Sequence, residues 1–199
     1  MNDYRANSLR RLAGKMDMEF QAEDTAGLMA QLRDFRLFQS GRDRTIRNVI
    51  RRQDGLLESD LFIFDYSYRA WVGSSSQKHH HQTVFFLQSQ RLSLPEMRLQ
   101  PETLLHKVGE LVGLQDIDFV RFPKFSGQYR LTGPDEEYIR HHFNDEVLNY
   151  FTLNKGWTVE GLGYYLLFYR KDLLLPPDRI THFYWRGKKV YELLSDKAG

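Results

Sequence analysis

The hydrophobic residues of this chain are densest between positions 60 and 90, in two runs separated by a segment rich in Gly, Ser and His. The centres of the runs, LFIF at 61–64 and VFFL at 84–87, are apolar at every position. Successive side chains of a β-strand point to opposite faces of its sheet, so both faces of each run are apolar. Strands of this kind lie in the interior of a sheet. The pattern therefore predicts a central hairpin over about 58–90.

Helical patterns flank this hairpin on both sides. Leu9, Leu12 and Met16 recur at helical spacing among basic residues, so residues 1–16 are either a short amphipathic basic helix or a frayed terminus. Start signals, stop signals and apolar stripes predict further helices near residues 24–33, between Pro101 and Gly113, after Pro134, between Asn144 and Lys155, and after Pro176. The last of these is predicted to be an amphipathic C-terminal helix that packs on the sheet by one stripe.

Period-two alternation predicts further strands. Before the central hairpin, Ile46 and Ile50 should share one face of a strand, with Val49 on the other. Further extended segments are expected at 97–99, at 129–131 and in a second hairpin with a turn at Gly161-Leu162-Gly163. Strands in clusters, with helices between them and no regular βαβ alternation, indicate an α+β domain on a mainly antiparallel sheet.

Length and composition narrow the possible organisation. The 199 residues fit a single domain, so we divide the chain into a basic N-terminal segment, residues 1–16, and one α+β domain, residues 17–199. The sequence has no cysteine, which excludes disulfides, thiolate metal sites and a cysteine nucleophile. No apolar run reaches the ~18–20 residues of a membrane span, and the first residues lack the apolar core of a secretory signal. We therefore expect a soluble protein without a transmembrane segment and with a cytoplasmic location.

Three consecutive histidines are the first candidate for chemistry. In a strand, His79 and His81 would project to the same face and could ligate a transition metal, with Asp65 as a nearby acid. A catalytic zinc centre needs three protein ligands, and the sequence offers no ligand spacing that completes one here. We expect these histidines to be polar residues near an exposed turn, and we keep His79, His81 and Asp65 as the candidate metal ligands. No cofactor is predicted.

Two other groups of residues are candidates for ligand or partner binding. An acid beside tyrosines on a strand, here Asp65, Tyr66 and Tyr68, can line a ligand groove, although a sheet core also requires such aromatic residues. The segment 33–52 holds seven arginines against two aspartates. It is either a solvated face or a patch for phosphate and carboxylate groups, in which Arg44, Arg51 and Arg52 would donate the hydrogen bonds.

Several motifs together show a resemblance to a known group of proteins. They are FDYSY (64–68), QTV (82–84), LPEMRLQPE (94–102), DIDF (116–119), FSGQYRLTGPDE (125–136), VEGLG (159–163) and LLFYR (166–170). Over roughly residues 35–170 the chain resembles an uncharacterised bacterial family whose members often carry a soluble domain beside membrane-spanning helices. The resemblance implies an α+β domain without an assigned activity, and it transfers no site residues. This chain differs from those members in having no spanning segment.

No motif in the sequence specifies a reaction. GxSxG, GxGxxG, GxxxxGK[ST] and HExxH are all absent. Our leading hypothesis is therefore a non-enzymatic binding or scaffold domain with a protein partner. The first alternative is a metal-dependent enzyme or metal-binding protein that uses the hairpin histidines. The second alternative is a peripheral module that binds phosphate, a lipid headgroup or nucleic acid through the arginine-rich strand.

Overall fold

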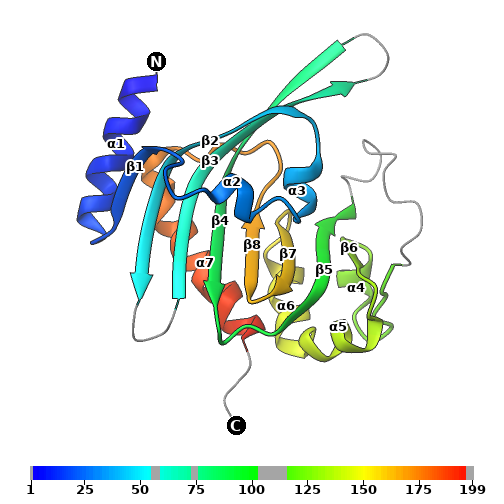
Figure 1. Cartoon of the computed structure of the whole chain (residues 1–199). Coiled ribbons are helices and arrows are strands. Elements are labelled where there is room, and N and C mark those ends of the chain that lie inside the picture. The colour runs from blue at the N-terminus through cyan, green and yellow to red at the C-terminus, as the bar shows by residue number, and fades with distance from the viewer. Residues whose placement is uncertain (1, 55–58, 73–75, 103–115, 196–199) are drawn as a thin grey trace.

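The computed structural model of the chain describes residues 2–54, 59–72, 76–102 and 116–195. They form one antiparallel sheet with helices on both faces (Figure 1). The strands are β1 (Glu19–Glu23), β2 (Arg42–Asp54), β3 (Ser59–Val72), β4 (Ser76–Ser89), β5 (Leu94–Pro101), β6 (Tyr129–Thr132), β7 (Thr158–Gly163) and β8 (Tyr165–Tyr169). Their order across the sheet is β1-β2-β3-β4-β8-β7-β5-β6. The predicted α+β class with a mainly antiparallel sheet is confirmed.

The central hairpin predicted over 58–90 is present as β3 and β4. The two strands pair without a break in register from Ser59 opposite Ser89 to Val72 opposite Ser76. They occupy the third and fourth places in the sheet of eight strands, so both are interior strands. Ile63 packs in one hydrophobic core cluster and Phe64 in the other, which places a core on each face of the sheet. We call these the first face, which carries Ile63, and the second face, which carries Phe64.

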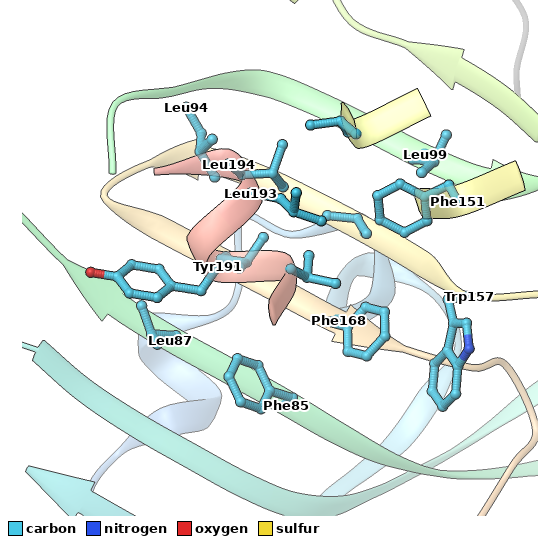
Figure 2. Packing of buried hydrophobic residues seen from close by; sticks show 14 of the residues in the cluster. Phe85, Leu87, Leu94, Leu99, Phe151, Trp157, Phe168, Tyr191, Leu193 and Leu194 are labelled. Carbon is cyan, nitrogen blue, oxygen red and sulfur yellow. The ribbon is translucent and has the colours of Figure 1, made fainter. Parts of the chain in front are cut away.

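The first face carries the larger core. It is covered by α1 (Asn2–Lys15), α5 (Glu136–His142), α6 (Asp145–Leu153) and α7 (Ile180–Leu194). Figure 2 shows Phe85 of β4 and Phe168 of β8 on the sheet, with Tyr191 and Leu194 of α7 above them. All four side chains are buried. Each apolar side chain of this size contributes about 1.5–3 kcal/mol by leaving water, so this layer is the main source of stability.

Helices form on the first face where the predicted start signals lie. The Asp135 side chain accepts a hydrogen bond from the Tyr138 backbone N–H at the start of α5. The Asn144 side chain accepts from Glu146 and Val147 at the start of α6. Such caps satisfy backbone donors that the first turn of a helix leaves unpaired. The predicted C-terminal helix begins one short 3₁₀ turn, Pro177–Arg179, after Pro176.

Two short helices cover the second face. They are α2 (Leu28–Gln31) and α3 (Arg36–Gln39), and the first of them is shorter than the helix expected at 24–33. Gly27, directly before α2, has the left-handed φ of 73°, which starts the helix late. Phe38 of α3 packs on Tyr66 of β3, with ring centroids 4.4 Å apart. This layer is small, and a pocket opens between α3 and strands β5 and β7.

The prediction of which sheet face each apolar residue of β2 occupies is wrong. Ile46 and Val49 both lie on the second face and Ile50 lies on the first. A bulge between Arg47 and Ile50 shifts the register against β3, and Asn48 within it has a positive φ of 53°. An extra residue in one strand reverses the alternation of side chains after it, which simple period-two counting cannot foresee.

Other differences from the sequence pattern are local. Pro95 lies inside β5 instead of ending the strand region, at a place where the register against β7 is irregular. In the second hairpin, β7 continues through Gly163 and the turn falls between Gly163 and Tyr165. The N-terminal segment forms α1, with Leu9 and Ala13 buried on the first face. The helix expected between Pro101 and Gly113 lies outside the described residues.

The packing of α7 on β4 gives a direct test of this architecture. A Cβ atom at Gly187 would overlap the ring of buried Phe85. We expect Gly187→Ala to lower the free energy of unfolding, because overpacking costs about 1–3 kcal/mol and the gain in helix propensity is only ~1 kcal/mol. Urea denaturation measures the change.

Gly14 in α1 provides the matched control for this experiment. Nothing lies within 4 Å of a Cβ at this exposed position. Gly14→Ala should therefore raise the free energy of unfolding by up to about 1 kcal/mol through helix propensity alone. Equal stabilisation by both substitutions would contradict the packing of α7 on β4.

Candidate functional site

A pocket of about 360 Å³ opens on the second face beside α3, over β5 and β7. We call it the Glu160 pocket. Phe35 and Leu162, which pack in or against the second-face core, line it with apolar side chains, together with charged residues. The charged residues of the lining are Asp34, Arg36, Glu96, Arg98 and Glu160. A concave site of this volume, with apolar walls and a few convergent polar groups, has the properties of a small-molecule binding site.

Glu160 is the most deeply buried charged residue of this pocket. Its side chain comes from β7 and is only 3% exposed. Oε1 accepts a hydrogen bond of 2.7 Å from the Tyr169 hydroxyl, and Oε2 accepts one of 2.7 Å from the Arg36 backbone N–H. A buried carboxylate needs such donors, because burial without them is very costly. Glu160 thus holds the start of α3 to the sheet and places a negative charge beneath the pocket.

Arg98 lies opposite Glu160 on β5. Its Nε is 3.8 Å from Glu160 Oε1, too far for a hydrogen bond, and this buried nitrogen has no partner in the protein. Burial lowers the pKa of Arg98, but Tyr169 and Glu160 outweigh it and the net direction is upward. Arg98 is therefore a charged group with donor capacity left over, and a quarter of its side chain is open to solvent.

Tyr169 completes the polar group beneath the pocket. Burial raises the pKa of its hydroxyl well above the ordinary value, and the Glu160 carboxylate raises it further. Tyr169 therefore keeps its proton at physiological pH and acts as the donor to Glu160. Tyr68 lies near enough to influence the pKa values of both Tyr169 and Arg98.

The structure brings the two candidate tyrosines together on the second face. Tyr66 and Tyr68 are buried, and their ring centroids are 5.5 Å apart. The Tyr66 hydroxyl has no hydrogen-bond partner in the protein, and burial raises its pKa. Tyr68 also stacks on His80 at 4.6 Å. Tyr68 thus borders the charged group of the Glu160 pocket, whereas Tyr66 packs under α3.

Asp65 points to the opposite face and is separated from both tyrosines. Arg5 of α1 donates two hydrogen bonds of 2.7 Å to its two oxygens. Asn48 donates a third at 2.8 Å and Thr83 a fourth at 3.3 Å. These donors occupy the lone pairs that a metal or ligand would need, and they hold α1 against the sheet.

His79 and His81 lie side by side on the first face of β4. Both are exposed, with ring centroids 4.0 Å apart. The pKa of His79 is lowered by partial burial and by the neighbouring His81 and Arg69. Among the residues that the structure describes, no group of three or more His, Asp or Glu side chains could hold a metal ion. The two histidines therefore meet as expected, but without a third ligand from that part of the chain.

The histidine between them has a different role, which the sequence did not indicate. His80 points to the second face and is 7% exposed. Its Nδ1 is 2.5 Å from Asp172 Oδ1, and Lys78 donates a hydrogen bond of 2.5 Å to Oδ2 of the same carboxylate. Burial raises the pKa of Asp172, but the hydrogen bonds from Lys78 and His80 outweigh burial and lower it. The cluster ties the loop after β8 to β4.

The arginines of β2 are spread over different surroundings. Arg44 donates to the backbone carbonyls of Gly41 and Gln39. Arg51 donates to Asp60 at 3.1 Å and lies over the Phe62 ring. Arg52, the next residue along the strand, is exposed. Adjacent strand residues face opposite ways, so the three predicted donors do not form a single patch.

Sequence reasoning missed Glu160, Arg98 and Tyr169. A usable signal was present for Glu160, because TVEGLG places one charged residue inside a run that is otherwise apolar or small. A charge inside a buried strand requires a partner. The identity of that partner depends on the register of β5 against β7, which the sequence does not specify.

Comparison with protein-family models, with curated proteins and with solved structures found no match. The resemblance to a bacterial family of soluble domains stays a prediction. In the described part of the chain, no helix is long and apolar enough to cross a membrane.

Two buried tyrosines test the polar group beneath the pocket. We expect Tyr169→Phe to lower the free energy of unfolding by about 1.5–3 kcal/mol, because it removes a hydrogen bond to a charged group. Tyr66→Phe is the matched control, since its hydroxyl is buried without a partner in the protein. That substitution should be neutral or stabilising. Thermal and urea denaturation compare the two, and equal losses would contradict the assigned hydrogen bond.

Proposed function

We propose that the protein is a binding domain, not an enzyme, and that its Glu160 pocket takes a small zwitterionic ligand. Such a ligand carries a carboxylate and a positively charged group, as an amino acid does. The observation that supports this most is the partly unpaired guanidinium of Arg98 in the lining of a pocket of about 360 Å³.

Arg98 favours a carboxylate as one end of the ligand. A guanidinium presents planar donors that match the two oxygens of a carboxylate. Glu160 does not fill this role, because its nearest oxygen is 3.8 Å from Nε and already accepts from Tyr169. A ligand carboxylate would accept hydrogen bonds from the part of the Arg98 side chain that is open to solvent, and the apolar side chains of Phe35 and Leu162 would contact the rest of the molecule.

The other charges of the lining favour a positive group at the second end. The lining holds three carboxylates, from Asp34, Glu96 and Glu160, and two arginines. A simple anion would be repelled by the carboxylates, and a simple cation by the arginines. Asp34 and Glu96 are exposed and therefore lie towards the mouth of the pocket. A ligand with charges of both signs complements both groups.

The state of the buried groups supports binding without catalysis. Both oxygens of Glu160 already accept hydrogen bonds from the protein, and Tyr169 keeps its proton because of its raised pKa. Tyr169 is therefore not poised to exchange a proton with a substrate near neutral pH, and the Glu160 oxygens are engaged within the protein. The protein partner, the bacterial origin and the cytoplasmic location expected from the sequence stay predictions.

Three six-carbon probes of matched length test this proposal. Titration with 6-aminohexanoate, hexanoate and hexylamine should shift the backbone amide NMR signals of residues 96–98 and 160–162. We expect 6-aminohexanoate to bind most tightly, because it alone can satisfy both signs of charge. Arg98→Met should weaken its binding about tenfold or more, since hydrogen bonds to charged groups contribute strongly.

Two further variants control for loss of folding and of charge. Arg98→Lys keeps the charge beside Glu160 but loses the planar donors, so it should retain the fold and bind more weakly than the native protein. Arg121→Met removes an exposed arginine elsewhere and should leave binding unchanged. Tightest binding of hexylamine, or no dependence on Arg98, would refute the proposed ligand. Hydrolysis of ester or phosphoester substrates above background by metal-loaded protein would refute the absence of catalysis.

A further inference from the structure

A second pocket, of about 450 Å³, lies on the first face between the end of α6, the segment after β8 and the start of α7. We call it the Trp157 pocket. Figure 2 shows Trp157 next to Phe168 at the margin of the first-face core. The lining includes Lys155, Arg170, Arg179 and Arg186, and it includes no aspartate or glutamate. Four formal positive charges therefore surround this pocket without a carboxylate in its wall.

Two of these cations lie over the ring of Trp157. The guanidinium carbons of Arg170 and Arg186 are 5.5 Å and 5.3 Å from its centroid. Trp157 is 9% exposed and its ring stacks on that of Phe168, with centroids 4.7 Å apart, so its position is fixed by the core. The negative face of an indole attracts cations. The Trp157 ring thus stabilises two positive charges, those of Arg170 and Arg186, which would otherwise repel each other.

The hydrogen bonds of these two arginines leave their charges uncompensated. Arg170 donates to the carbonyl oxygens of Gly156 and Lys155, at 3.0 Å and 3.1 Å. Arg186 donates to Asn154 Oδ1 at 3.1 Å, and its Nη2 is 3.2 Å from His182 Nε2. A guanidinium has no acceptor, so His182 Nε2 accepts this bond. Every one of these partners is neutral.

The local backbone is shaped to hold Arg170 in this position. Gly156 has a positive φ of 87°, and a Cβ atom there would collide with the Arg170 guanidinium. Glycine is the residue that tolerates this conformation and leaves the space for the side chain. Arg179 has a carboxylate 4.0 Å away on Asp178, but both side chains are more than two-thirds exposed. Ion pairs of this kind contribute little, so Arg179 remains able to bind an anion.

We propose that the Trp157 pocket is a phosphate-binding site. A phosphate dianion carries charge and acceptor oxygens for several guanidinium and ammonium groups at once, which a single carboxylate does not. The phosphate could belong to a free phosphorylated molecule or to a lipid headgroup. Leu153, which also lines the pocket, is 82% exposed, so an apolar group attached to the phosphate would meet an apolar contact.

The site is independent of the Glu160 pocket, with which it shares no residue. It also differs from the arginine-rich strand, because none of its cations lies in residues 33–52. Failure of zwitterion binding at Arg98 would therefore leave the phosphate site unaffected, and the reverse also holds.

The test titrates the full chain with inorganic phosphate and with glycerol 3-phosphate at constant ionic strength. The indole N–H signal of Trp157 in the NMR spectrum reports binding. We expect a saturable shift with both probes. Lys155→Ala/Arg179→Ala removes two exposed cations without touching the Trp157 stack, and it should weaken binding about tenfold or more because each charge-assisted hydrogen bond contributes strongly. Arg170→Gln/Arg186→Gln should abolish the shift if that variant folds.

The charge-matched control is Arg121→Ala/Lys124→Ala, which removes two exposed cations elsewhere and should leave affinity unchanged. Sedimentation with phosphatidylcholine vesicles, with and without phosphatidic acid, separates the two sources of phosphate. Binding to phosphatidic acid that glycerol 3-phosphate displaces indicates a lipid headgroup, and binding to the soluble probes alone indicates a free phosphorylated molecule. The absence of a saturable shift, or equal weakening by both double variants, would overturn the proposal.

Discussion

The apolar character of both faces of the central hairpin is the constraint on which the rest of this structure depends. Ile63 and Phe85 on one face, and Phe64 and Phe86 on the other, all need to leave water. The first face receives α1 and α7 with α5 and α6, whereas the second receives two helices of four residues each. Each pocket lies where one of these layers ends, the Glu160 pocket beside α3 and the Trp157 pocket beside α7.

The charged residues near these layers divide into two kinds. Asp65 and Asp172 have their oxygens engaged by arginine, lysine, histidine or amide donors, and they join separate segments to the sheet. Arg98 and Arg186 have incomplete or neutral partners beside open space. The carboxylates of the first kind have all the hydrogen-bond donors they need within the protein. The arginines of the second kind can still donate to an anion, so the two proposed binding sites depend on them.

The sequence predicted what depends on local patterning. It placed the central hairpin, the second hairpin and the capped starts of α5 and α6, because alternation and capping residues act over a few positions. It did not reveal the β2 bulge, where Asn48 adopts a positive φ, nor the pairing of Arg98 with Glu160. Both depend on strand register, which tertiary packing decides. The candidates chosen from sequence were residues that cluster along the chain, such as the three histidines and the arginines of 33–52. The residues of the two pockets come from separate segments, and only folding brings them together. They include Arg98, Glu160, Arg170 and Arg186.

We infer that anions bind at Arg98 and Arg186 in the two pockets, and not along the arginine-rich strand. Anomalous X-ray diffraction from crystals soaked in sodium bromide tests it directly, because bromide accepts hydrogen bonds from guanidinium groups and its position can be located without ambiguity. We expect bromide next to Arg98 in the Glu160 pocket and next to Arg186 in the Trp157 pocket. Bromide confined to Arg44, Arg51 and Arg52 of β2, with neither pocket occupied, would contradict the account.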